Sequence, residues 1–111
     1  MNTVTIIAQE VSRITGISIF DMLSERREAP IIDARHMAIA LTKEFTPFGS
    51  AKVAKAWKRA DHTSILHAYR VWPERMQKRG LHVKFGEARE AVRARILTRR
   101  VSDVDIAPTR P

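Results

Sequence analysis

A run of small polar side chains opens one amphipathic segment of the chain. Asp61, His62, Thr63 and Ser64 follow one another, and His67 comes about one turn later. Hydroxyl and imidazole groups suit hydrogen bonds to base edges in the DNA major groove, and a threonine methyl can contact a thymine methyl. We expect the apolar side chains of the same segment to face the core: Ile65, Leu66, Tyr69 and Trp72. The polar ones then point outward.

The segment is the second half of a helix-turn-helix pattern. Residues 50–72 read as a short helix, a polar turn at 58–60 and a longer helix. In such a unit the second helix enters the major groove with its amino-terminal residues at the base edges. Basic side chains around it are predicted to contact phosphates: Lys52, Lys55, Lys58, Arg59 and Arg70.

Catalysis and metal binding fit these residues poorly. Asp61, His62 and Ser64 lie within one helical turn and cannot adopt the base-to-nucleophile geometry of a hydrolase. His62 and His67 are five residues apart, which differs from the i, i+4 spacing of a helical metal pair, and the chain has no cysteine. We therefore expect no enzyme activity, no metal and no cofactor.

The charge balance indicates a polyanionic partner. The 111 residues include 20 Lys and Arg against 12 Asp and Glu, a net charge of +8. Nucleic acid is the first candidate and an anionic membrane surface the second. No apolar run approaches the roughly 18 residues of a membrane span. We expect a cytoplasmic, nucleoid-associated protein.

Apolar residues recur at helical spacing, so the sequence predicts an all-α helical bundle. Gly16 should end the first helix, Ser18 should cap a short helix through Leu23, and Ser24–Ile32 should be a loop. Asp33 should cap the third helix, with Met37, Ala40, Leu41 and Phe45 on its buried face, and Thr46-Pro47 should end it. The remaining predicted helices are Ala51–Trp57 capped by Ser50, a helix from Asp61 to Pro73, and Val83–Thr98. Residues 1–100 form the predicted domain, and 101–111 a flexible tail.

Three blocks of sequence resemble one known family. Asp61–Ala68 (DHTSILHA) closely resembles the signature of the carboxy-terminal DNA-binding domain (domain IV) of the bacterial replication initiator DnaA. Met22–Arg27 (MLSERR) resembles the basic loop of that family, and Ala34–Leu41 (ARHMAIAL) the helix after it. The likeness covers about residues 4–98. Because the chain opens with Met1, we expect a stand-alone protein of this type.

The resemblance implies a Trp-repressor-like helix-turn-helix domain that binds short double-stranded DnaA boxes. It implies major-groove base contacts by Asp61, His62, Thr63, Ser64 and His67. Arg27 matches the arginine that the family inserts into the adjacent minor groove. The resemblance further implies phosphate contacts by Arg26, Arg35 and Lys43.

The chain departs from the family pattern at several positions. Ala60 replaces the arginine before Asp61, Ser50-Ala51 replaces Leu-Pro, and acidic residues reduce the charge of the basic loop: Glu25, Glu28 and Asp33. No Gly-x-x-x-x-Gly-Lys-Ser/Thr loop for ATP is present. We expect a monomer that occupies DnaA-box-like sites and modulates replication initiation or transcription. The alternative is a protein–protein adaptor that keeps the fold and binds the initiator or its regulators.

Overall fold

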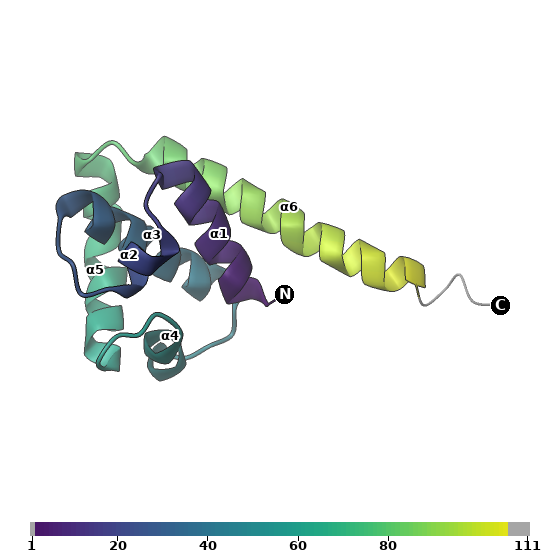
Figure 1. Cartoon of the computed structure of the whole chain (residues 1–111), viewed down its shortest axis with the longest axis horizontal. Coiled ribbons are helices and arrows are strands. Elements are labelled where there is room, and N and C mark those ends of the chain that lie inside the picture. Colours follow the sequence, from purple (N-terminus) through teal and green to yellow (C-terminus); the bar gives the residue numbers. More distant parts are fainter. Residues whose placement is uncertain (1, 107–111) are drawn as a thin grey trace.

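The computed structural model describes residues 2–106, and the side chains of residues 2–99. Over these residues the chain forms helices and no strand, as the sequence predicts (Figure 1). The helices are α1 (Thr3–Thr15), α2 (Ile19–Leu23), α3 (Ala29–Phe45), α4 (Ser50–Ala56), α5 (His62–Lys78) and α6 (His82–Ile106). Within this part, no helix has the length and apolar character needed to cross a membrane.

Local capping signals set several of the helix ends. Ser18 accepts a hydrogen bond from the Asp21 amide, and Asp61 accepts one from the Thr63 amide, so both predicted caps are confirmed. Gly16 has a φ of 77° and ends α1 as predicted, because glycine adopts the left-handed conformation without a Cβ clash. The prediction that Ser50 caps the fourth helix is wrong: α4 begins at Ser50, and Gly49 is its cap residue, with no side-chain cap hydrogen bond.

The predicted start of α3 is wrong. The helix begins at Ala29, because Pro30 lies in the first turn, where a proline amide has no partner to lose. Asp33 is therefore inside the helix and is not its cap. Its buried carboxylate accepts hydrogen bonds of 2.6 Å from both Arg75 and Arg79. These ion pairs tie α3 to the second half of α5.

The predicted stop of α5 at Pro73 is also wrong. The helix continues to Lys78, with Pro73 in its interior. Trp72 is buried on one side of the proline, and the Asp33 ion pairs hold the helix on the other side. These tertiary contacts outweigh the missing hydrogen bond of the proline. The helix ends where Gly80 takes a φ of 64° and the Leu81 amide bonds the Met76 carbonyl.

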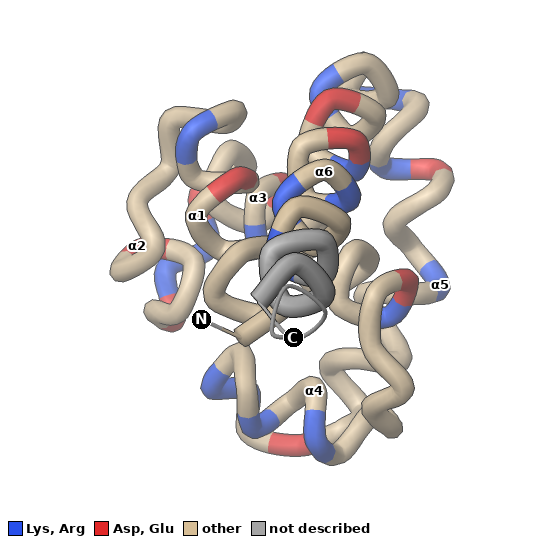
Figure 2. The backbone as a smooth tube through the Cα atoms, turned by 90° about the vertical axis from the view of Figure 1, so that its right-hand side faces the viewer, with Lys and Arg blue, Asp and Glu red and all other residues tan. Residues whose placement is uncertain are grey.

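Helix α6 packs along α1 and extends beyond the rest of the bundle (Figure 1). It runs to Ile106, six residues into the segment expected to be a flexible tail, and residues 107–111 lie outside the described part. Basic and acidic positions lie close together along it (Figure 2). Arg95 pairs with Glu10 on α1, and Arg89 with Glu44 on α3. The charge of α6 is thus partly compensated.

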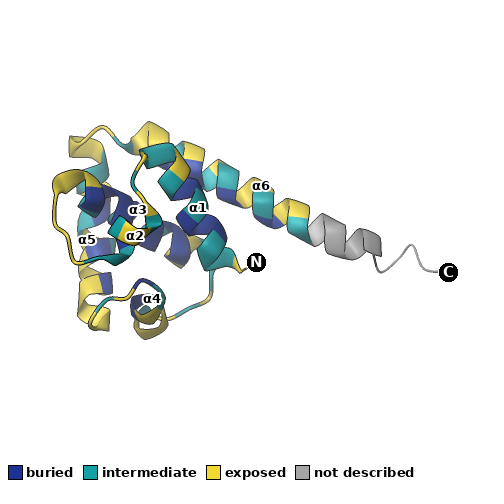
Figure 3. Ribbon diagram, viewed as in Figure 1, coloured by how far each residue is buried: buried dark blue, intermediate teal, exposed yellow. Residues whose placement is uncertain are grey.

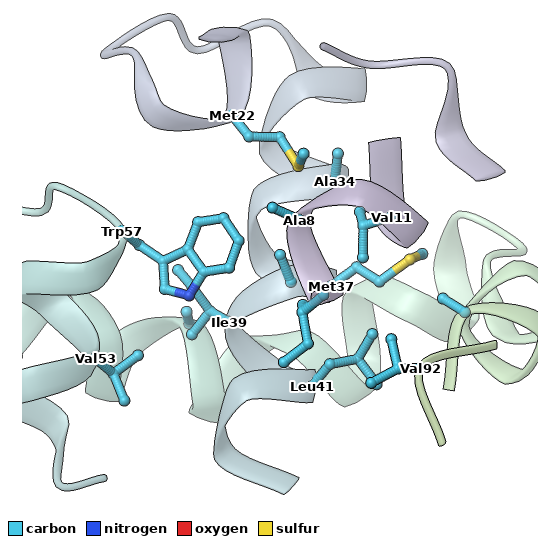
Figure 4. Close-up of a cluster of buried hydrophobic side chains, with 14 of the residues drawn as sticks. Ala8, Val11, Met22, Ala34, Met37, Ile39, Leu41, Val53, Trp57 and Val92 are labelled. Atoms are coloured by element: carbon cyan, nitrogen blue, oxygen red, sulfur yellow. The ribbon is translucent and has the colours of Figure 1, made fainter. Parts of the chain in front are cut away.

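The core receives side chains from all six helices, with Met22 as the buried residue of α2 (Figure 4). Met37 and Leu41 are buried as predicted, whereas Ala40 and Phe45 are half-buried. Trp57 is buried, and its Nε1 donates to Thr42 Oγ1 at 2.9 Å. A buried donor with a partner avoids the cost of desolvation without a hydrogen bond. This bond fixes the end of α4, and therefore the following turn, against α3.

Candidate nucleic-acid interface

The first turn of α5 is rigid and exposed. Asp61 Oδ1 accepts from the Thr63 amide at 2.9 Å, and Ser64 Oγ donates to the Asp61 carbonyl at 2.9 Å. Asp61, His62, Thr63 and Ser64 are all exposed (Figure 3). The turn therefore presents hydroxyl, imidazole and carboxylate groups outward on a backbone that is already ordered.

One stripe of α5 faces a shallow hollow. We call Thr63, Leu66, His67 and Arg70 the α5 stripe: their spacing of i, i+3, i+4 and i+7 places them on one helical face, and all four line the hollow. The prediction that Leu66 faces the core is wrong, because its side chain is 48% exposed. Ile65 and Ala68 are the residues that α5 buries there.

Arg70 sets the hydrogen-bonding role of His67. The Arg70 Nη2 atom lies 3.1 Å from His67 Nδ1. A guanidinium only donates, so Nδ1 must accept, and the proton of the neutral ring is on Nε2. His67 therefore presents a donor to anything that approaches its outer edge.

The loop between α2 and α3 lies on the same side of the molecule as α5 (Figure 1). Arg27 of this loop is exposed and lines the hollow of the α5 stripe. Two other arginines hold the loop backbone. Arg35 donates to the carbonyls of Met22 (2.8 Å), Asp21 (3.3 Å), Ser24 (2.8 Å) and Arg26 (2.9 Å).

Arg59 completes this support from the turn after α4. Its guanidinium donates to the carbonyls of Leu23 (3.0 Å), Ser24 (2.7 Å) and Trp57 (3.0 Å). The turn before α5 is thus bonded directly to the start of the loop. These bonds anchor the loop backbone up to Arg26, the residue before Arg27, beside the start of α5.

The prediction that Arg35 contacts a phosphate is wrong for this structure. The residue is only 6% exposed, and its donors serve backbone carbonyls. Burial, followed by the positive charges of Arg59 and Arg27, lowers the pKa of Arg35. Arg59 is half-buried and similarly engaged, so it too acts first as a support for the loop.

Arg26 is largely neutralised. It pairs with Asp21 at 3.3 Å and with Glu28 at 3.0 Å, and the hydrogen bond to Glu28 is the main cause of its raised pKa. By contrast, Arg27, Lys58 and Arg70 form no ion pair with any described side chain. The carboxylates that line the hollow beside these cations are Glu25 and Asp61.

The remaining predicted phosphate contacts lie away from the hollow. Lys43 Nζ is 4.6 Å from the centre of the Tyr69 ring, and Lys52 Nζ is 4.1 Å from that of Phe48. Lys52 and Lys55 line a separate hollow at the start of α1. Basic positions surround α4 and the turn after it (Figure 2), so these lysines can still add positive potential at the flank.

His36 was expected on the surface of its helix, near the DNA backbone, and it lies beside His67 of the α5 stripe. It is half-buried, and its ring centre lies 6.4 Å from that of His67 in an edge-on arrangement. Burial, then the charges of Arg75 and His67, lowers its pKa to about 4. The sequence contains a weak signal for this burial, since His36 lies three residues after Asp33 and three before Ile39, both buried. Among the described residues, no group of His, Asp or Glu is placed to hold a metal.

Comparison with known proteins finds a matching family model and similar curated proteins. A family model described as the bacterial dnaA protein helix-turn-helix matches residues 4–71. The chromosomal replication initiator protein DnaA of Buchnera aphidicola subsp. Cinara cedri (strain Cc) is 33% identical over 60 residues, which are 54% of this chain and 14% of that protein. The chain therefore spans a small part of the length of this relative. Both the α5 stripe and the loop with Arg27 fall within the matched residues of the family model.

Proposed function

The chain belongs to the bacterial DnaA helix-turn-helix family, and we propose that it binds double-stranded DNA at DnaA-box-like sites. The observation that carries this proposal is that Arg27 and the α5 stripe line one exposed hollow. Helix α5 would lie in the major groove, with base contacts by Asp61, His62, Thr63, Ser64 and His67. Arg27 would enter the adjacent minor groove, where narrow A·T-rich DNA attracts a cation.

The supporting arginines make this arrangement suitable for reading two grooves at once. Arg59 bonds the start of the loop to the α4–α5 turn and Arg35 bonds the loop to α3, so the backbone that leads to Arg27 is anchored near α5. A preordered surface loses less conformational entropy on binding than a mobile one. The loop and the helix would then fix the register of the protein on the duplex together.

The donor on His67 favours particular base edges. With Nε2 protonated, the ring would donate to a major-groove acceptor: N7 or O6 of guanine, N7 of adenine or O4 of thymine. The exocyclic amino group of cytosine would face a donor and would be disfavoured. Arg70 would act as a positioning residue for His67 and, with Lys58, as a phosphate contact.

We infer a regulatory role from the same site. A monomer that occupies DnaA-box-like sites on the nucleoid would compete with the replication initiator for these sites. It would thereby modulate replication initiation or transcription. Selection of bound duplexes from a random pool would identify the preferred site, and footprinting of a replication origin would locate it. Protection equal to that on random DNA would overturn site recognition.

A matched pair of variants tests which surface reads the DNA. We expect His62→Ala with Thr63→Ala to abolish the preference for the selected duplex, because both side chains are exposed at the start of α5. His82→Ala with Thr98→Ala is the control, since these exposed residues lie on α6. Anisotropy titrations against selected and scrambled duplexes would measure the preference at a fixed salt concentration.

A second candidate function is favoured by the acidic loop. Arg26 is neutralised by Asp21 and Glu28, and Glu25 lines the hollow beside Arg27. Such a surface would suit an adaptor that binds the replication initiator or its regulators. An adaptor would bind selected and scrambled duplexes equally, and the His62→Ala, Thr63→Ala variant would leave its protein binding unchanged.

A further inference from the structure

The α5 stripe includes one apolar side chain that the core does not use. Leu66 is 48% exposed and lies one turn after Thr63 and beside His67. The Thr63 methyl and the Leu66 side chain thus form a small apolar area within an otherwise polar stripe. A single exposed leucine is ordinary on a protein surface, so its place within this stripe carries the inference.

We propose that Leu66 determines specificity by contacting the C5 methyl group of a thymine in the major groove. The inference rests on the proposed binding of α5 in that groove. The thymine methyl is the apolar group that natural base pairs present there, whereas the other edges are hydrogen-bond donors or acceptors. A leucine pressed against the amino group of adenine or cytosine would desolvate that donor without replacing its hydrogen bond. Leu66 therefore selects thymine by attraction and the amino-bearing bases by exclusion.

The neighbours of Leu66 fix where it would act. The Thr63 backbone N–H donates to Asp61 Oδ1, and Arg70 holds the His67 ring, so the backbone before Leu66 and the side chain after it have defined positions. His67 would donate to an acceptor on one base, and Leu66 would meet the next base along the groove. The preferred site would contain a thymine adjacent to the position that His67 reads.

Removing the methyl group from the DNA tests the contact directly. In the duplex selected by the whole protein, each thymine would be replaced in turn by deoxyuridine, which keeps every hydrogen bond and lacks only the methyl. We expect a loss of about fourfold in affinity at one position, the value for burying a single methyl group. The Leu66→Ala variant should bind the thymine duplex more weakly than the wild type. Its affinity should no longer change when deoxyuridine replaces thymine at that one position, and should respond as in the wild type at the others.

Control variants separate the possible outcomes. Leu97→Ala removes a leucine of α6 that is 60% exposed, and it should keep the full sensitivity to deoxyuridine. Leu66→Met, which keeps an apolar side chain, should keep it too. A contradicting outcome is that Leu66→Ala is as sensitive to deoxyuridine as the wild type at every position, while His62→Ala, Thr63→Ala loses the preference for the selected duplex. In that case the role of Leu66 is wrong and the proposed function stands. If the selection yields no preferred duplex, both fail.

Discussion

At the scale of single residues, the side chains of the site either face outward from α5 or hold the backbone of the loop before α3. Asp61, His62 and Thr63 sit outward because a helix with a buried side leaves its other side exposed. Arg35, for which the family resemblance implies a phosphate contact, holds the loop backbone instead. Its carbonyl partners lie 9 to 14 residues away in the chain, a separation that no local pattern reveals.

Arg35→Met tests the supporting role of this arginine. We expect the free energy of unfolding to fall by about 2–3 kcal/mol, because buried carbonyls lose charge-assisted hydrogen bonds. Arg26→Met is the control and should leave it nearly unchanged, since its ion pairs are exposed. Urea denaturation would measure both, and equal effects would contradict the assignment.

Glu25→Gln tests the electrostatics of the hollow. The Glu25 carboxylate lines the hollow with Arg27 and Lys58, where it would repel DNA phosphates. We expect duplex binding to become several-fold tighter at low salt, with the gain shrinking as salt rises and screens the charge. Glu87→Gln removes an exposed carboxylate of α6 and should leave affinity unchanged. Tighter binding by both variants to the same degree would argue for net charge alone.

His36 predicts a pH dependence of stability. Its folded pKa of about 4 lies below the ordinary value of 6.5, so between these values the unfolded chain binds more protons. Stability is therefore lost as the pH falls from 6.5 towards 4, by about 2–3 kcal/mol in total. Asp33, Arg35, His67 and Arg75 are the charged or titratable groups around it.

The measurement is urea denaturation across that pH range. His36→Gln should show a flatter profile between pH 6.5 and 5, above the range in which the carboxylates titrate. Parallel profiles for the variant and the wild type would assign the loss of stability to other groups.

At the scale of elements, local rules succeeded where the chain itself supplied the partner. Ser18 and Asp61 cap the start of a helix, and Gly16 ends one, each through hydrogen bonds within a few residues. The sequence predicted all three helix boundaries. Pro30 and Pro73 both lie within helices, against the predictions of a loop over Ser24–Ile32 and of a helix that stops at Pro73. Pro30 falls in a first turn, and the helix around Pro73 is held by buried Trp72 and by the ion pairs of Asp33, contacts that arise only in the folded state.

The turn between α4 and α5 contains Lys58 in a strained backbone conformation, and a substitution can relieve this strain. Lys58 has a φ of 55°, while the Arg59 amide bonds the Ala54 carbonyl in the manner of a helix end that usually uses glycine. We expect Lys58→Gly to stabilise the fold by up to about 1 kcal/mol, because glycine has no Cβ clash in this conformation.

The same variant should bind DNA more weakly. It removes one cation at the hollow, so the slope of log affinity against log salt should become shallower by about one unit. Lys84→Gly, on α6, is the control for loss of a lysine and should leave that slope unchanged. Thermal unfolding and salt-dependent titration would measure the two effects separately, and an unchanged slope would place Lys58 outside the DNA contact.

At the scale of the whole molecule, the arginines of α6 that form ion pairs lie apart from the cations around the hollow, which form none with the described side chains. On α6, Arg89 and Arg95 pair with carboxylates of α3 and α1, so they dock the helix. Around the hollow, Arg27, Lys58 and Arg70 lack such pairs among the described side chains, so positive potential gathers there. Net charge alone predicted a polyanionic partner. Its location needed the fold, because the sequence does not show which charges are paired.

Methylation protection of the selected duplex tests the central claim most directly, since dimethyl sulfate attacks guanine N7 in the major groove and adenine N3 in the minor groove. The account predicts protection of guanine N7 in the major groove and of neighbouring adenine N3 in the minor groove. Arg27→Ala should lose the minor-groove protection, and His62→Ala, Thr63→Ala should lose the major-groove protection. A pattern indistinguishable from that on random DNA, or one confined to a groove that neither variant affects, would contradict it.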